Sequence, residues 1–186
     1  FLSSGLLYRY ASYQLLKKKP LNKKRYLNKI FSNLNLNKLK NLNLHTQKIS
    51  EHTSLIAKQN KIREILKKFQ INFSKKNNRC IIEGRDIATK IIPKSDIKFF
   101  FVCNLHKAAK RRYIDLKKKT PNIKFLEVKK ALKNRNLRDK NRKHSPLLKH
   151  RDALEIDTGK LSKYEMVKKM SLIIDKKIKK KYGRRY

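Results

Sequence analysis

Hydrophobic residues recur every three or four positions over long stretches of this chain, which is the spacing of an amphipathic helix. The pattern predicts five helices, at about residues 4–19, 54–73, 105–119, 120–143 and 163–181. Pro20 should end the first helix, because proline cannot continue one. Ser162 and Glu165 have the spacing of a capping box and should begin the last.

Short runs of consecutive apolar residues separate these helices. The runs at 80–82, 97–102 and 153–156 predict strands, and the second, with three consecutive Phe, is typical of a strand covered on both faces. Strands that alternate with helices predict right-handed crossovers and a parallel sheet, so the expected fold class is α/β. In residues 21–48, leucines alternate with polar residues, which favours further short strands.

Basic residues strongly outnumber acidic ones: 52 Lys and Arg against 13 Asp and Glu give a formal net charge of +39. Such a surface attracts phosphate backbones, so we expect nonspecific affinity for nucleic acids. The excess is spread evenly, with 21 basic and 4 acidic residues in 1–93 and 31 and 9 in 94–186. A dedicated binding arm would concentrate it, and no aromatic platform accompanies the charge. A small basic RNA-binding protein stays an alternative because of the net charge alone.

No apolar run approaches the roughly 18 residues of a membrane-spanning helix, which excludes an integral membrane protein of that kind. Two cysteines cannot form a zinc tetrad or a disulfide framework, so a cytoplasmic location is expected. The five histidines lack metal-ligand spacing, and no metal site is expected in this chain. Because residue 1 is Phe and not Met, we expect the sequence to begin inside a longer reading frame.

Two groups of charged residues could bind a ligand. Gly84-Arg85-Asp86 follows a predicted strand, and ligands of parallel α/β sheets bind beyond the carboxyl ends of the strands. A solvated ion pair in a turn would explain this tripeptide equally well.

The second group, Arg135, Arg138, Asp139 and Arg142, has the spacing of one helical stripe. Its guanidinium groups suit phosphate oxygens, and its carboxylate suits sugar hydroxyls. An exposed charged face is the alternative interpretation.

Several segments match the bacterial cytidylate kinases in order and spacing. They are Ser4-Gly5 with Tyr8-Arg9; Ser54, Ile56-Ala57 and Ile62-Arg63; 82–89; 96–100; Arg111-Arg112-Tyr113; 135–142 with Pro146-Leu147; and 152–165. The resemblance implies a parallel-sheet P-loop nucleoside-monophosphate kinase fold, as a single kinase domain over 1–186. It further implies an inserted monophosphate-binding subdomain at 20–50 and a lid region at 104–122. The family transfers the γ-phosphoryl group of ATP to CMP or dCMP, giving CDP or dCDP, and uses Mg²⁺.

The resemblance also implies roles for single residues. Ser54, Arg63 and Asp86 match positions that contact the cytosine base. The residues that match contacts to the acceptor phosphate are Ser4, Arg9, Arg85 and Arg142. Arg135 and Asp139 match ribose contacts, with Arg138 as their neighbour. Arg111 and Arg112 match catalytic lid arginines that neutralise the transferring phosphoryl group.

One family feature has no match in this chain. The four glycines, Gly5, Gly84, Gly159 and Gly183, lie singly, so no glycine-rich ATP phosphate loop is present. We expect that loop and the first strand of the family sheet to lie before Phe1. Residues 1–186 alone, which we expect to be monomeric, should then be inactive as a kinase. An inactive relative that retains only CMP binding is the second alternative.

Overall fold

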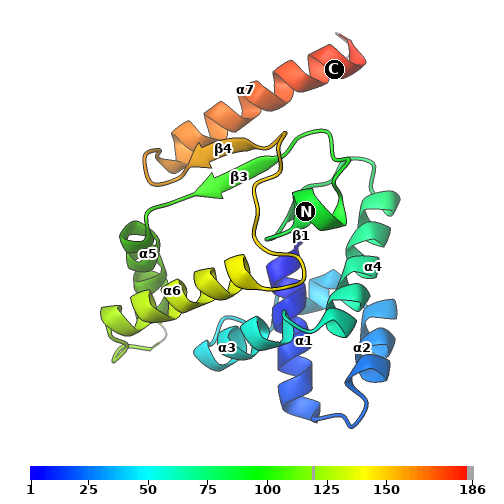
Figure 1. Ribbon diagram of the computed structural model, residues 1–186, viewed down its shortest axis with the longest axis vertical. Helices are drawn as coiled ribbons and strands as arrows, with labels where there is room; N and C mark the ends of the chain where they lie inside the picture. The colour runs from blue at the N-terminus through cyan, green and yellow to red at the C-terminus, as the bar shows by residue number, and fades with distance from the viewer. Residues whose placement is uncertain (119, 184–186) are drawn as a thin grey trace. The chain divides into compact units, whose positions relative to one another are not determined.

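The computed structural model describes residues 1–118 and 120–183. The chain divides into two compact units: the first unit is Phe1–Pro93 with Arg138–Leu148, and the second unit is Lys94–Leu137 with Lys149–Tyr186. Figure 1 shows helices throughout and short strands between them. The strands pair in parallel, which confirms the α/β fold class.

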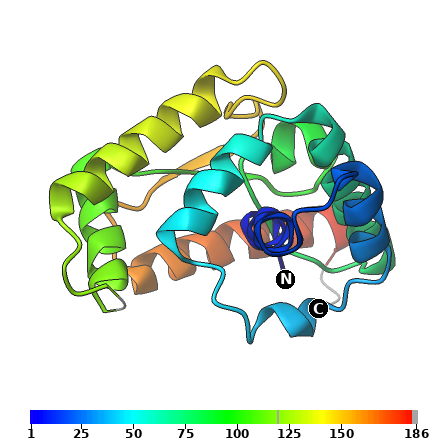
Figure 2. The same ribbon diagram turned by 90° about the horizontal axis from the view of Figure 1, so that it is seen from below.

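The first unit is mainly helical. Its helices are α1 (Ser4–Lys18), α2 (Lys23–Ser32), the 3-10 turn η1 (Leu36–Leu39), α3 (Gln47–Ile56) and α4 (Asn60–Lys76). Figure 2 views α1 nearly end-on, with α3 packed beside it. The hydroxyl of Ser3 accepts a hydrogen bond from Leu6 N and caps α1.

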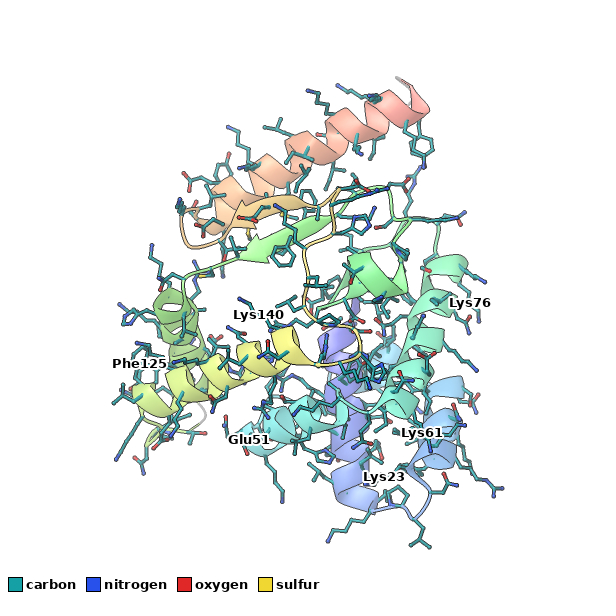
Figure 3. The ribbon with its side chains drawn as sticks, in the orientation of Figure 1. Lys23, Glu51, Lys61, Lys76, Phe125 and Lys140 are labelled. Carbon is teal, nitrogen blue, oxygen red and sulfur yellow. The ribbon has the colours of Figure 1, made fainter. Side chains whose placement is uncertain are left out.

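The core of this unit lies where α1, α2 and α4 meet. Leu7, Leu27 and Leu66 are fully buried there, together with Phe31. Lysines cover the outside, and Lys23, Lys61 and Lys76 are exposed on α2 and α4 (Figure 3). The helices are thus amphipathic, with their apolar sides turned to one core.

Two short strands complete the first unit. β1 (Leu2–Ser3) pairs in parallel with β2 (Ile82–Glu83), so both strands end at the same edge. A single π-helical turn, η2 (Ile87–Ile91), follows β2. The residues between β2 and η2 therefore lie next to the start of α1.

The second unit holds the other strand pair. β3 (Phe99–Val102) pairs in parallel with β4 (Leu154–Asp157), and Figure 1 shows the two arrows side by side. Its helices are α5 (Leu105–Lys117), α7 (Lys163–Tyr182) and the larger part of α6 (Phe125–Asn141), whose last turn belongs to the first unit. The predicted capping box is confirmed, because Ser162 and Glu165 bond to each other's backbone N–H groups.

The prediction of short strands in residues 21–48 is wrong. This segment forms α2 and η1, and Asn22 caps α2 by accepting a hydrogen bond from Arg25 N. Leu27 and Phe31, four residues apart, are buried on one face of α2. This spacing is that of a helix, so the alternation of leucines after residue 33 does not produce strands.

Several predicted boundaries also move. The predicted helix at 54–73 is two helices, α3 and α4, and the helix placed at 120–143 spans only Phe125–Asn141. Residue 119, at the end of the predicted 105–119 helix, lies outside the described residues.

The 97–102 strand is not covered on both faces, which corrects that prediction. Phe101 is 49% exposed, so its side of β3 is open to solvent. Among the helices described, none is long and apolar enough to cross a membrane.

Candidate functional site

The site begins where β1 and β2 end. A Cβ atom added to Gly84 would lie 2.9 Å from Ser4 Cβ and 2.7 Å from Ile87 Cγ1, closer than real Cβ atoms come. A side chain at position 84 would therefore push α1 away from the turn that follows β2. The glycine lets Arg85 and Asp86 lie against the start of α1.

Asp86 is the centre of a group of buried charges. Its Oδ2 accepts a hydrogen bond from Arg63 Nη2 of α4, and its Oδ1 lies 4.0 Å from Arg142 Nη2. The backbone carbonyl of Asp86 accepts bonds from the first turn of η2, including Lys90 N at 2.8 Å. Because both backbone and side chain are held, the carboxylate has a fixed position.

Arg142 links this carboxylate to a second one. Its Nη1 lies 3.5 Å from Asp139 Oδ1, and Asp139 Oδ2 lies 3.3 Å from Arg85 Nε. Arg142 Nε donates to the carbonyl of Ser145, a residue with a positive φ of 53°. These five charged side chains, Arg63, Arg85, Asp86, Asp139 and Arg142, are called the ionic cluster below.

The predicted helical stripe is correct only in part. Arg135, Arg138 and Asp139 lie on α6, whereas Arg142 follows its last residue, Asn141. Arg142 reaches Asp139 because the chain turns back after the helix, and Leu147 N bonds to Asp139 O at 2.7 Å. Arg135 belongs to the second unit.

Burial distinguishes this cluster from a charged surface. Asp86 is 4% exposed and Arg63 is 5% exposed, so the solvated ion pair considered for Gly84-Arg85-Asp86 is excluded. Burial, and next the positive charge of Arg63, lowers the pKa of the Arg142 guanidinium. Three guanidinium groups with two carboxylates leave one excess positive charge. A bound anion would reduce the electrostatic repulsion between Arg142 and Arg63.

The buried side-chain atoms of the first unit include polar groups without a hydrogen-bond partner. Ser54 Oγ of α3 and Arg142 Nη2 have no hydrogen-bond partner within the described residues. A buried donor or acceptor without a partner costs roughly 1–3 kcal/mol. Water or a bound ligand can supply the missing partners.

Comparison with known proteins identifies the family of this chain. A family model described as "Cytidylate kinase" matches residues 1–176. The chain belongs to the cytidylate kinase family. The cytidylate kinase of Rickettsia rickettsii (strain Sheila Smith) is 41% identical over 138 residues, which cover 74% of this chain and 63% of that protein. The cytidylate kinase of Bacillus licheniformis is 35% identical over 137 residues, covering 74% of this chain and 60% of that protein. The matched residues thus span about three fifths of the length of these relatives.

The residues matched to cytidylate kinases lie in both units. Ser4, buried at the start of α1, is beside Gly84, and Arg9 donates from Nη1 to Leu44 O at 3.0 Å and to Ser50 Oγ at 2.8 Å. In the second unit, exposed Arg111 of α5 donates from Nη2 to Thr158 O at 2.7 Å. Arg112, also on α5, is half-buried. The residues matched to contacts with the base and the acceptor phosphate thus lie in the first unit, and the lid arginines lie in the second.

Some residues of the site have no assigned role in the sequence-based interpretation. Tyr8 places its ring against Arg63, with 5.7 Å between the Arg63 Cζ atom and the ring centroid. The carbonyls of Ala57 and Ser145 orient Arg63 and Arg142. Tyr8 is adjacent to Arg9 in a matched cytidylate kinase segment, and this adjacency is the available signal. The two backbone carbonyls could not be predicted from the sequence, since every residue has a backbone carbonyl.

The chain's own residues do not fit the ATP phosphates and Mg²⁺ expected for a cytidylate kinase. No group of three or more His, Cys, Asp and Glu that could hold a metal is found in residues 1–118 and 120–183. The four glycines lie singly in the sequence, so they form no glycine-rich phosphate loop. Among the described residues, neither ATP nor Mg²⁺ therefore has an evident set of ligands.

Proposed function

We propose that the first unit carries the acceptor-nucleotide site of a CMP or dCMP kinase. The reaction assigned to the whole protein is transfer of the γ-phosphoryl group of ATP, with Mg²⁺, to CMP or dCMP to form CDP or dCDP, and the first unit contributes the acceptor side of this reaction. The observation that supports this proposal best is the ionic cluster, in which Arg63, Asp86 and Arg142 are buried. The cluster carries excess positive charge, and Arg142 Nη2 has no hydrogen-bond partner within the described residues. A phosphate monoester supplies the anion that such a cluster lacks.

Base recognition is assigned to Asp86, Arg63 and Ser54. Asp86 would accept a hydrogen bond from the exocyclic amine of cytosine, and Arg63 would donate to the ring nitrogen and carbonyl. Uracil presents the opposite polarity at two of these positions and would leave buried groups without partners. The buried, unpartnered hydroxyl of Ser54 is available for a further contact.

Phosphate and ribose are assigned to the other matched residues. Arg85 and Arg142 would bind phosphate oxygens in bidentate fashion, together with Ser4 and Arg9. Asp139 would accept hydrogen bonds from the ribose, with Arg135 as a second ribose contact. The 20–50 insertion would support this site through Leu44, whose carbonyl accepts a hydrogen bond from Arg9.

The lid is assigned to 104–122, with Arg111 and Arg112 as the arginines that neutralise the transferring phosphoryl group. Arg111 would have to exchange its bonds to Thr158 for bonds to phosphate. We further propose a cytoplasmic monomer, whose nucleic-acid affinity comes only from its net charge.

The test is calorimetric titration of CMP and UMP into the chain and its variants at fixed ionic strength. Asp86→Asn replaces an acceptor oxygen by a donor, so CMP affinity should fall by about 1–3 kcal/mol while UMP binding changes little. Arg142→Ala should weaken CMP and UMP equally, because Arg142 is assigned to phosphate alone. Arg151→Ala is the matched control, since the Arg151 side chain is 91% exposed. Circular dichroism at the titration temperature establishes that each variant is folded.

Equal loss of CMP and UMP on Asp86→Asn would remove Asp86 from base recognition. If CMP binding followed only ionic strength and none of the three substitutions changed it, the chain would be a nonspecific polycation. A wild-type chain without measurable CMP affinity would refute the proposed function itself.

A further inference from the structure

Tyr8 belongs to the apolar core and to the ionic cluster at the same time. The residue is 8% exposed and packs within the group of buried side chains that includes Leu7, Ala11 and Leu66. Its ring also faces Arg63, whose Cζ lies 5.7 Å from the ring centroid. A cation within about 6 Å of an aromatic face is attracted by the ring quadrupole, and more strongly when water is excluded.

Arg63 is held by three groups. Nη1 donates to Ala57 O at 3.1 Å, Nη2 donates to Asp86 Oδ2, and the ring of Tyr8 lies against the guanidinium. A guanidinium has five N–H donors, so two are used and the other three stay available to a ligand. The flanking residues Ile62 and Ile65 are buried in the core, which anchors this part of α4.

The tyrosine contributes its ring and not its hydroxyl. Burial raises the pKa of Tyr8 to about 12, against the opposing effect of the Arg63 charge, so the side chain is a neutral phenol at pH 7. Within the described part of the chain, no hydrogen bond to this hydroxyl is found. The attraction between Tyr8 and Arg63 is therefore that of a cation and a neutral aromatic face, which phenylalanine would preserve.

We propose that Tyr8 is a positioning residue that sets the orientation of Arg63, and thereby the preference of the site for cytosine over uracil. This inference rests on the proposed function, because it takes Arg63 as a base-reading group. The ring attracts the guanidinium from one side, and the hydrogen bonds to Ala57 O and Asp86 Oδ2 fix its direction. The remaining N–H groups then point in defined directions, as a site that reads hydrogen-bond polarity requires.

The chain provides a matched control on the same helix. Tyr13 of α1 also has a cation near its ring, with Lys17 Nζ 5.6 Å from the centroid. Tyr13 is only partly buried, and Lys17 is exposed and outside the ionic cluster. Tyr13→Leu thus removes a tyrosine and a cation–π contact of similar length from α1 without touching Arg63.

The experiment measures CMP and UMP affinity by calorimetry for Tyr8→Phe, Tyr8→Leu and Tyr13→Leu. Tyr8→Phe keeps the ring, so both affinities should stay within about twofold of wild type. Tyr8→Leu should lower CMP affinity about tenfold and UMP affinity less, which reduces the preference for CMP. Tyr13→Leu should leave both affinities unchanged.

A second series avoids the loss of buried volume in Tyr8→Leu. Phenylalanine carrying one, two or three ring fluorines at position 8 keeps the shape of the ring while weakening its negative face. CMP affinity should decrease stepwise with each fluorine, and the CMP-to-UMP ratio should decrease with it. A purely structural role of the ring would give no such gradient.

The outcomes separate the two proposals. If wild type does not bind CMP, the proposed function fails. If wild type binds CMP, the inference about Tyr8 is overturned by a flat fluorine series, by an unchanged CMP-to-UMP ratio in Tyr8→Leu, or by a loss in Tyr8→Phe equal to that in Tyr8→Leu.

Discussion

The two units differ in what they bury. In the first unit, twelve buried side chains from β1, α1, α2, η1, α3 and α4 form one apolar core. The second unit has a few separate buried apolar residues, among them Leu116, Val128 and Ile156, and α7 has none. Large apolar side chains such as Tyr164, Val167 and Leu172 are exposed on α7.

The ion pairs follow the same division. The Arg63–Asp86 and Arg142–Asp86 pairs of the ionic cluster are buried in the first unit, whereas Lys149–Glu155 and Lys181–Asp96 in the second unit are between exposed side chains. Buried charges keep their geometry because the surrounding core fixes them, and exposed pairs are weakened by water and salt. Both units are rich in charged residues, but charged side chains form a site of fixed geometry only where an apolar core surrounds them.

The largest effect should come from breaking a buried ion pair. Asp86→Asn leaves the Arg63 charge buried without its carboxylate and Arg142 with Asp139 alone, at a cost of about 3–5 kcal/mol in the free energy of unfolding. Glu155→Gln breaks the exposed pair and should cost less than about 1 kcal/mol. Urea denaturation followed by circular dichroism at pH 7 measures both. Similar losses for the two variants would abolish the distinction between the units.

Truncation of apolar side chains tests the cores directly. Leu66 is fully buried, so Leu66→Ala should lower the free energy of unfolding by about 2–5 kcal/mol through lost contacts and a cavity. Leu172→Ala removes the same atoms from a residue that is 63% exposed and should stay within about 0.5 kcal/mol of wild type. The same denaturation assay applies. A large effect at Leu172 would indicate that α7 is covered in solution.

The capping box gives a smaller, local effect in the second unit. Ser162→Ala removes the hydroxyl that accepts from Glu165 N and should destabilise the start of α7 by about 1 kcal/mol. Hydrogen bonds from Ser162 lower the pKa of Glu165, so their stabilisation is present above the ordinary glutamate pKa and lost as pH falls through the lower folded value. Amide hydrogen exchange should become faster in α7 and stay unchanged in α1. Faster exchange in both helices would show that they unfold together.

His52 gives the smallest effect, in the first unit. Burial, and next the charge of Lys23, lowers the pKa of His52, whose Nδ1 lies 3.1 Å from Ser12 Oγ. The unfolded chain then binds the proton more readily, so stability should decrease as pH falls from about 6.5 towards the lower folded pKa. His52→Gln should flatten this slope, and Lys23→Gln should reduce it in part. Unfolding midpoints measured between about pH 7 and pH 5 check the prediction, which an unchanged slope in His52→Gln would contradict.

Local features of the fold can be predicted from the sequence. Ser162 caps α7 as expected, since a cap depends on residues only three positions apart. The strand prediction for 21–48 is wrong because the helical signal comes from Leu27 and Phe31, whose common face is recognised only against the core they contact. Phe101 is exposed where burial is expected, since a hydrophobic residue does not by itself specify its neighbours.

The candidate site can be predicted only in its parts. Composition gives no reason to separate Asp86 from other acidic residues, and its assignment comes from resemblance to the family. Its burial depends on α4, on the turn after β2 and on the chain after α6, which lie far apart in sequence. Tertiary contacts of this kind have no signature in a local pattern, so the ring of Tyr8 against Arg63 is also beyond sequence reasoning.

The ionic cluster also has a consequence for the order of folding. Arg63 and Asp86 are 23 residues apart, and Arg142 is more distant still, so their contacts close long loops, whereas the helices of the first unit form from neighbours. Loop closure costs entropy before the contacts compensate for it. We expect the cluster to assemble after the folding transition state, so Asp86→Asn should accelerate unfolding and leave the refolding rate nearly unchanged. Stopped-flow chevrons of wild type and Asp86→Asn would establish this, and a slower refolding arm would place the cluster in the folding nucleus instead.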